Sequence, residues 1–290
     1  MTDIISIRLM GGLGNQLFQL FTVIAYSIEH NKTVVLPYVD KLHVGTVRNT
    51  YWETFLMGLK HLTTYNSNIH ETNESLLKMQ LYKESNFHYT QIPKLNARTL
   101  LFGYYQSYKY FEKYRNILLH MIQFKDHLNN TKHEYSHLFT DTDTDTDIIS
   151  VHFRFADYKN IQESHPILDI QYYYNALCNI CISNNKKYRI LYFCQECDND
   201  DVSQIISTLS NQFPELEFVK VDDSIQDWKQ LLIMSLCNHN IIANSTYSWW
   251  AAWLNMNMNK IICYPNRWFG PALSHDIKDL FPSDWIKIYW

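Results

Sequence analysis

Three polar residues, His152, Arg154 and Asp157, lie at the end of the apolar run 148–153. The run is predicted to be a buried strand, so their side chains would gather at its carboxyl end. An arginine there can donate two parallel hydrogen bonds to a pair of diphosphate oxygens. Asp157 could orient that guanidinium or accept a hydrogen bond from a ligand hydroxyl. In the alternative interpretation, Arg154 and Asp157 form only a structural ion pair that caps the turn.

A second polar group, Asn244, Ser245 and Thr246, follows the apolar run at 240–243. These residue types favour the start of a helix, and the helix predicted over 247–255 begins directly after them. Hydroxyl groups and backbone N–H groups at a helix N-terminus bind anions. The sequence therefore predicts an anion site here. The tryptophans of this helix are interpreted mainly as core anchors; they are Trp249, Trp250 and Trp253.

Three glycines, Gly11, Gly12 and Gly14, separate an Ile-rich run at 4–9 from a helix predicted over 15–30. Glycine lets the backbone approach a ligand closely and adopt a positive φ, and a helix start offers N–H groups without intrahelical partners. This turn is a third candidate anion site. Alone it is a weak signal, since glycine-rich turns between a strand and a helix are common without a ligand.

Strands and helices alternate along the chain, which is typical of parallel sheets with right-handed crossovers. The first strand–helix–strand unit is expected over 4–36, and a long stretch at 60–99 shows no clear period. Expected strands lie at 100–105, 148–153, 188–193, 216–219, 240–243 and 260–264, and helices at 52–59, 110–128, 170–183, 200–212, 225–237 and 247–255. Ligands bind such sheets at the carboxyl ends of the strands, where all three polar groups fall.

We therefore expect an α/β fold of two Rossmann-type parallel-sheet domains, one over 1–147 and one over 148–290, with a linker at about 130–147. The length of 290 residues suits this division. A net charge of −4 argues against a general nucleic-acid binder. No apolar stretch is long enough to span a membrane, and the N-terminus shows no signal pattern, so a cytoplasmic protein is expected.

The segment Asp141–Asp147 alternates aspartate with threonine. Asp-x-Asp holds manganese and a diphosphate in one class of sugar transferases, but there it ends a strand, whereas this repeat precedes one. A calcium loop would need glycine at the sixth position and glutamate at the twelfth, and the sequence has neither. We interpret the repeat as a solvated acidic linker.

Two CxxC pairs, Cys178/Cys181 and Cys194/Cys197, have the spacing of a zinc ribbon. The first pair falls inside a predicted helix, and neither pair has the glycine knuckle that would turn two thiolates onto one metal. Free cysteines in a packed core are therefore the preferred interpretation, and a zinc-ribbon module is the alternative. No metal and no cofactor are expected.

Three stretches together resemble the α-1,2-fucosyltransferases of glycosyltransferase family 11, which are related to the nodulation and protein O-fucosyltransferases. The stretches are Gly11-Gly-Leu-Gly-Asn-Gln16, His152-x-Arg-x-x-Asp-Tyr158 and Asn244-Ser-Thr-Tyr-Ser-Trp-Trp250. The resemblance implies a GT-B-like pair of domains facing a cleft, with the acceptor side in the N-terminal domain and the nucleotide-sugar site in the C-terminal one. It also implies GDP-β-L-fucose as donor and metal-independent, inverting transfer to a glycan hydroxyl in α-1,2 linkage. A lipid-linked acceptor would bring the protein to a membrane surface.

The same resemblance implies residue roles. Arg154 would bind the β-phosphate and Asn15 would lie near the transferred sugar; with Asp157 and His152 they form the expected catalytic group. The expected donor-binding residues are Gly12, Gly14, Asn15, Arg154, Asn244, Ser245, Thr246 and Ser248. No single general base is identified, because several side chains qualify by their chemistry. These are Asp157, His152, Glu163 and His165, of which the last two could also contact the acceptor.

One departure from the family pattern concerns the leaving group. The family often reads His-x-Arg-Arg-Gly-Asp-Tyr, and here Phe155 and Ala156 replace the second arginine and the glycine. The change removes one positive charge beside the diphosphate. Two alternatives therefore stay open: transfer of another 6-deoxysugar such as rhamnose on the same scaffold, and a non-catalytic carbohydrate-binding protein whose aromatic side chains stack on sugars.

Overall fold

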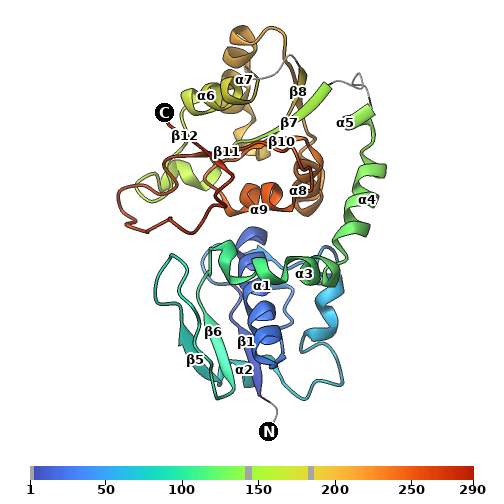
Figure 1. The fold of residues 1–290 in the computed structure, drawn as a ribbon, viewed down its shortest axis with the longest axis vertical. Helices are drawn as coiled ribbons and strands as arrows, with labels where there is room; N and C mark the ends of the chain where they lie inside the picture. Colours follow the sequence, from blue (N-terminus) through green and yellow to red (C-terminus); the bar gives the residue numbers. More distant parts are fainter. Residues whose placement is uncertain (1–2, 141–145, 182–185) are drawn as a thin grey trace. The chain divides into compact units, whose positions relative to one another are not determined.

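The computed structural model describes residues 3–140, 146–181 and 186–290, which form two compact units (Figure 1). Unit 1 comprises Met1–His127 and His275–Pro282, and unit 2 comprises Leu128–Ser274 and Ser283–Trp290. The segment His275–Pro282, which returns to unit 1, is anchored there by Ser107, whose hydroxyl donates to the Asp279 carbonyl at 2.6 Å. The part of the expected acidic linker at 141–145 lies outside the described residues.

Unit 1 is built on a parallel sheet in the order β2-β1-β6-β5. Its strands are β1 (Ile4–Ile7), β2 (Thr33–Val34), β5 (Gln80–Lys83) and β6 (Thr99–Phe102). Helix α1 (Leu13–His30) connects β1 to β2, and its side chains are buried over most of its length. The predicted first strand–helix–strand unit is therefore confirmed. Strand β5 was not predicted, because three of its four side chains are exposed and give no apolar pattern.

The smaller elements of unit 1 differ more from the sequence-based expectations. The helix expected over 110–128 is wrong as a single helix, because Gln123 has a φ of +54° and separates two shorter helices. The short helix expected over 52–59 begins later, as a 3₁₀ helix. The smaller elements include an antiparallel hairpin of β3 (Lys41–Leu42) and β4 (Arg48–Asn49). The helices are η1 (Met57–Leu62), α2 (Asn73–Leu77), η2 (Tyr108–Tyr110), η3 (Glu112–Tyr114), α3 (Arg115–Met121) and α4 (Phe124–Glu134). Helix α4 continues into unit 2, where α5 (His137–Thr140) follows it.

Unit 2 is a six-stranded parallel sheet in the order β12-β11-β10-β7-β8-β9. Its strands are β7 (Thr146–His152), β8 (Lys187–Phe193), β9 (Glu217–Lys220), β10 (His239–Ile241), β11 (Ile262–Pro265) and β12 (Ile286–Ile288). Its helices are η4 (Ala156–Asn160), α6 (Ile170–Cys181), η5 (Glu196–Asp198), α7 (Asn199–Gln212), α8 (Asp227–Leu236) and α9 (Thr246–Leu254). The predicted alternation is confirmed, and with it the α/β class with a parallel sheet in each unit.

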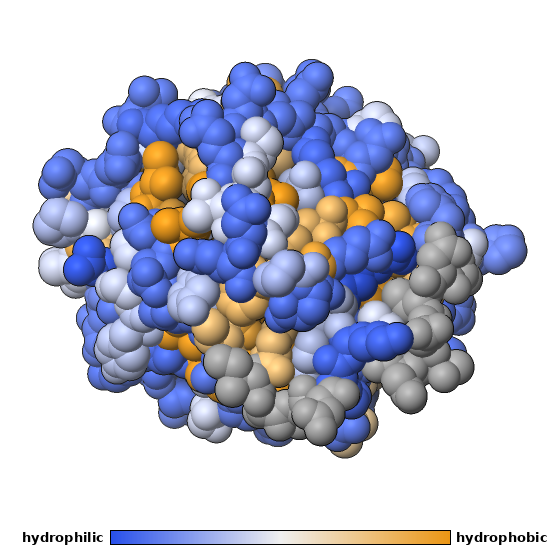
Figure 2. Space-filling view, turned by 90° about the horizontal axis from the view of Figure 1, so that it is seen from above, coloured by the Kyte–Doolittle hydropathy of each residue, from blue (hydrophilic) through white to orange (hydrophobic). Residues whose placement is uncertain are grey.

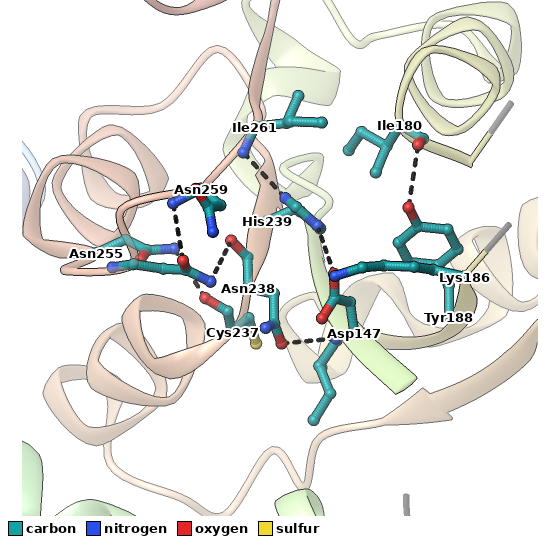
Figure 3. A network of polar contacts seen from close by, with 12 residues as sticks. Asp147, Ile180, Lys186, Tyr188, Cys237, Asn238, His239, Asn255, Asn259 and Ile261 are labelled. Carbon is teal, nitrogen blue, oxygen red and sulfur yellow. Dashed lines mark hydrogen bonds and ion pairs between the residues drawn. The ribbon is translucent and has the colours of Figure 1, made fainter. Parts of the chain in front are cut away.

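A polar network at the amino edge of this sheet fixes the starts of β10 and β11 (Figure 3). His239 Nδ1 accepts a hydrogen bond from the Ile261 N–H at 2.9 Å, and its Nε2 lies 3.3 Å from Asp147 Oδ2. Lys186 also reaches that carboxylate, at 2.7 Å. Burial lowers the pKa of His239, so the ring is neutral and its proton lies on Nε2. The network is structural and lies at the edge opposite the strand ends that carry the motifs.

In Figure 2, hydrophilic residues cover most of the face shown, interrupted by apolar patches. Within the described parts of the chain, no helix is both long and apolar enough to cross a membrane.

Candidate functional site

The sheet of unit 2 has a topological switch point between β7 and β10. From β7 the chain moves through β8 to β9 on one side, whereas β10, β11 and β12 follow on the other side. Ligands bind open α/β sheets outside the carboxyl ends of the strands at such a point. His152 ends β7 and Asn244 follows β10 closely, so the structure brings both predicted polar groups of this half to the switch point.

Arg154 lies at this edge with its guanidinium held by two oxygens. It donates to Gln195 Oε1 and to Asp157 Oδ1, each at 2.5 Å. Its guanidinium carbon lies 4.9 Å from the centre of the Tyr158 ring, and the Tyr158 hydroxyl donates to the Asn244 carbonyl at 3.1 Å. Tyr158 thus connects Arg154 to the start of α9. The ion pair with Asp157 matches the structural alternative, but it and Gln195 use only part of the five-donor guanidinium.

Two residues of this cluster were missed from the sequence, Gln195 and Asp198. Asp198 is fully buried, and its two carboxylate oxygens accept from the Ala156 N–H at 2.9 and 2.8 Å. Lys159 reaches the same carboxylate at 3.2 Å. Asp198 therefore holds the turn that carries Arg154. Both residues follow β8, so the rule that ligands meet strand ends could have singled them out.

His152 is a buried, neutral side chain. It is 7% exposed, its ring lies 5.5 Å from the Tyr247 ring, and its Nδ1 is buried with no hydrogen-bond partner among the described residues. Burial, assisted by the charge of Arg154, lowers the pKa of His152 to about 3. So weak a base is poorly matched to proton abstraction near neutral pH, although its ring can still form a hydrogen bond.

The start of α9 is capped as expected from its residue types. Ser245 is the N-cap, and its hydroxyl accepts from the Tyr247 N–H at 3.3 Å. The Asn244 amide donates to the carbonyls of Pro166 and Trp268, while its Oδ1 is buried without a partner among the described residues. Thr246 is the first helical residue and is half-buried.

Ser248 and the three tryptophans of α9 face inward. The Ser248 hydroxyl is 1% exposed and lies 3.3 Å from the Ser245 carbonyl oxygen, so it bonds back to the backbone. The aromatic side chains pack on one another, with ring centres of Trp249 and Trp250 5.3 Å apart. The core-anchor interpretation of the tryptophans is confirmed, since all three are buried.

Of the other base candidates, His165 lies in the cluster. Its ring stacks on Tyr158 with centres 4.9 Å apart, and Phe269 packs against it at 5.6 Å. The side chain of Glu163 is exposed, and its backbone carbonyl accepts from the Ala272 N–H at 2.8 Å. Of Glu163 and His165, only His165 contacts the residues around Arg154 in these interactions.

The glycine turn of unit 1 lies at a second switch point, between β1 and β6. Gly11 has a φ of +76°, and a Cβ there would come within 2.4 Å of the Asn15 amide nitrogen. Gly12 is the N-cap of α1, with open space where a Cβ would point, and Gly14 is buried in the first turn. Asn15 Oδ1 accepts from the Gln106 amide at 3.0 Å. A side chain at Gly11 would therefore displace Asn15.

The two CxxC pairs do not meet. The Tyr188 hydroxyl donates to the Ile180 carbonyl at 3.3 Å, which holds Cys181 near the amino end of β8, whereas Cys194 follows its carboxyl end. Six strand residues separate those ends by about 20 Å. Burial raises the pKa of Cys181 to about 12 and that of Cys194 to about 11, which disfavours zinc-binding thiolates. Over residues 3–140, 146–181 and 186–290, no group of three or more His, Cys, Asp or Glu side chains could hold a metal.

The chain is similar to known glycosyltransferases over its whole length. The model of glycosyl transferase family 11 matches residues 2–289. The O-antigen biosynthesis glycosyltransferase WbnK of Escherichia coli is 28% identical, covering 97% of this chain and 99% of its own. The α-1,2-colitosyltransferase of Escherichia coli is 24% identical, covering 99% of both chains.

Solved structures resemble the chain more distantly. The fucosyltransferase NodZ from Bradyrhizobium aligns with a TM-score of 0.44 and 12% identity, over 87% of this chain and 92% of its own. The family model alone covers nearly every residue, including the three motif stretches at both switch points. The chain is therefore a glycosyltransferase that belongs to glycosyl transferase family 11.

Proposed function

We propose that this enzyme transfers L-fucose from GDP-β-L-fucose to a hydroxyl of a glycan, with inversion at the anomeric carbon and an α-1,2 linkage. The observation that carries the proposal is the meeting of Arg154, Tyr158 and the start of α9 at the switch point between β7 and β10. The family resemblance of the three motif stretches supports the donor. The α-1,2 linkage named for the colitosyltransferase relative supports the linkage and a deoxysugar donor.

In this mechanism the acceptor oxygen attacks the anomeric carbon on the face opposite GDP. The bond from that carbon to the β-phosphate oxygen breaks, and negative charge grows on the departing diphosphate. The remaining guanidinium donors of Arg154 and the N–H groups at the start of α9 would stabilise that charge more in the transition state than in the ground state. We propose that they fulfil this role without a divalent metal ion.

The neighbours of Arg154 then have positioning roles. Asp157 and Gln195 fix the guanidinium plane, and Asp198 fixes the turn from which it extends. His152, held neutral by burial, would contribute a hydrogen bond rather than a charge. His165 is the base candidate that the contacts favour, because it stacks on Tyr158, whose ring also contacts the Arg154 guanidinium.

Replacing Arg154 tests the proposal. Arg154→Lys keeps the charge but loses the two-donor geometry, so kcat/KM should fall by about 30- to 900-fold, equivalent to ~2–4 kcal/mol of barrier. Arg189→Lys is a matched control, because Arg189 is also an ion-paired arginine of unit 2 but binds Glu217 at the start of β9. Normal turnover by both Arg154→Lys and Arg154→Ala would contradict the assignment.

A second candidate, transfer of a different deoxysugar, is favoured by one observation. Phe155 is 4% exposed and packs 6.3 Å from Phe153 in the core, where the family often has arginine. The charge beside the leaving group thus differs from the family pattern. A panel of GDP-fucose, GDP-colitose, GDP-rhamnose and dTDP-rhamnose, with nucleotide release as readout, separates the two. The highest rate of nucleotide release with GDP-fucose would support transfer of fucose. The highest rate with another donor would support transfer of a different deoxysugar.

A non-catalytic carbohydrate-binding protein would behave differently in both assays. It would bind glycan without releasing nucleotide from any donor. GDP titration followed by calorimetry distinguishes it from an enzyme whose acceptor is missing, because only the enzyme binds GDP.

A further inference from the structure

The carboxyl edge of the unit 1 sheet carries a half-buried carboxyl group that neither the motifs nor the proposed mechanism uses. Glu84 follows β5, and Gly103 follows the neighbouring β6. Residues 103–107, here called the 103–107 turn, therefore begin beside the switch point between β1 and β6. The glycine turn and Asn15 follow β1 at the same edge, so Glu84 lies where this sheet would present groups to a ligand.

Glu84 supplies hydrogen-bond acceptors to the backbone of the turn. Its Oε2 accepts from the Tyr104 N–H at 2.8 Å and from the Tyr105 N–H at 3.1 Å, and its Oε1 accepts from the Tyr105 N–H at 3.0 Å. Tyr105 is fully buried and has a φ of +53°, a conformation that residues with side chains rarely adopt. The carboxyl group thus holds the turn in an otherwise unfavourable backbone conformation.

Gly103 makes room for this contact. A Cβ at Gly103 would lie 2.4 Å from both Glu84 Cβ and Glu84 Oε2. The Gly103 carbonyl accepts from the Gln19 amide at 3.2 Å, and Gln19 Oε1 in turn accepts from the Met10 N–H at 2.9 Å. Gln19 of α1 therefore links the start of the 103–107 turn to Met10, the residue just before the glycine turn.

The far end of the turn reaches Asn15. Gln106 is 8% exposed, and its amide donates to Asn15 Oδ1 at 3.0 Å. The next residue, Ser107, is fully buried and bonded to the Asp279 carbonyl, so the turn is anchored after Gln106 as well. Gln106, which orients the Asn15 side chain, therefore lies between Tyr105, held by Glu84, and Ser107, held by the Asp279 carbonyl.

The electrostatic surroundings make Glu84 sensitive to pH. Burial raises its pKa to about 7, against the lowering effect of the two backbone N–H groups. Burial, and to a lesser extent the charge of Glu84, raises the pKa values of two nearby phenols, Tyr105 of the turn and Tyr110 of η2. Burial also raises the pKa of Tyr82 in β5. The cation that follows β1, Arg8, stacks over the Phe102 ring at 5.4 Å. Glu84 therefore changes charge in the physiological pH range.

We propose that Glu84 is a positioning residue for glycosyl transfer: through the 103–107 turn and Gln106 it holds the Asn15 amide in its working orientation, most firmly when ionised. The proposal rests on the proposed role of Asn15 beside the transferred sugar. An ionised carboxylate accepts backbone hydrogen bonds more strongly than a carboxylic acid does. The fraction of enzyme with Asn15 correctly held should therefore rise with pH through the titration of Glu84.

The pH dependence of turnover tests this role. In wild-type enzyme, kcat should rise about tenfold through a step centred near pH 7, with little change in the KM of the donor. Glu84→Gln keeps an acceptor for the turn but cannot ionise, so the step should vanish and kcat should stay near the low-pH value. Glu71→Gln is the matched control, because Glu71 is a largely buried carboxylate that binds Arg98 at the opposite edge of this sheet. An unchanged step in Glu84→Gln would overturn the proposal.

Amide hydrogen exchange of the whole protein tests the turn without activity. In the wild type, exchange of the Tyr104 and Tyr105 amides, corrected for its intrinsic pH dependence, should become about tenfold slower as the pH rises from 6 to 8. Glu84→Gln and Gly103→Ala should both remove this change, and Glu71→Gln should preserve it. If no donor is turned over, the proposed function fails while this result still decides the role of Glu84. Protection that is independent of pH in the wild type would overturn the inference.

Discussion

Ala156 has a φ of +26° at the position where the family often has glycine. A left-handed conformation costs a residue with a side chain about 1–2 kcal/mol, whereas glycine loses about 0.5–1 kcal/mol of chain entropy on folding. Ala156→Gly should therefore stabilise the protein, by about 0.5–1 kcal/mol. Urea denaturation measures the change, and a loss of stability would show that the turn does not strain this residue.

The buried His152 makes the protein sensitive to acid. Its pKa is about 3 in the folded state and about 6.5 when unfolded. Because the folded value is the lower one, stability is full above pH 6.5 and is lost as the pH falls. Between pH 6.5 and 4.5 His152 should account for about 2 kcal/mol of that loss.

Comparing variants isolates this contribution. His152→Gln should flatten the acid limb of the stability curve, whatever its effect at pH 7, and substitution of the exposed His61 to Gln should leave the limb as it is. Denaturant midpoints measured at pH 6.5 and at pH 4.5 give the loss of stability between the two. An equal loss in wild type and in His152→Gln would contradict the assigned pKa.

The sequence could identify the residues whose types and local pattern indicate their chemistry, such as Arg154 and the Asn244–Thr246 cap. It could not identify Asp198 or Glu84 in the same way. Each acts on a backbone turn that comes from a different strand end, so its role depends on sheet order rather than on a local pattern. The same holds for Gln106, whose partner Asn15 lies 91 residues earlier in the chain.

At the scale of elements, the amino-edge network in Figure 3 should stabilise the protein without affecting its ligands. His239→Phe removes the acceptor for the Ile261 N–H and the partner of Asp147 Oδ2. Unfolding free energy should fall by about 2–3 kcal/mol, because buried polar groups lose their partners. GDP affinity measured by calorimetry should stay the same, since the network lies at the opposite edge from Arg154; a parallel loss of affinity would contradict this separation.

The strands that were predicted correctly are mostly those in the interior of the sheets. β7, β8, β10 and β11 are flanked by strands on both sides, most of their side chains are buried, and each overlaps an apolar run that is visible in the sequence. β5 and β12 lie at sheet edges, are only three or four residues long, and leave side chains exposed. The break at Gln123 gave no signal, because neither glycine nor proline marks it.

At the scale of the whole molecule, each unit carries its candidate groups at the switch point of its own sheet. In unit 2 these are Arg154 and the start of α9, and in unit 1 they are the glycine turn and the 103–107 turn. We propose that Arg154 and the start of α9 bind the diphosphate and that the 103–107 turn orients Asn15. The family model covers both units.

We propose that the Arg154 guanidinium and the capped start of α9 hold the diphosphate without a divalent metal ion. Calorimetric titration of GDP in the presence of EDTA, into wild type, Arg154→Lys and the control Arg189→Lys, tests it most directly. We expect wild type and Arg189→Lys to bind GDP equally in EDTA and Arg154→Lys to bind at least about tenfold more weakly, a loss of ~1.4 kcal/mol or more. Equal binding by Arg154→Lys, or binding by wild type only when Mg²⁺ or Mn²⁺ is added, would contradict it.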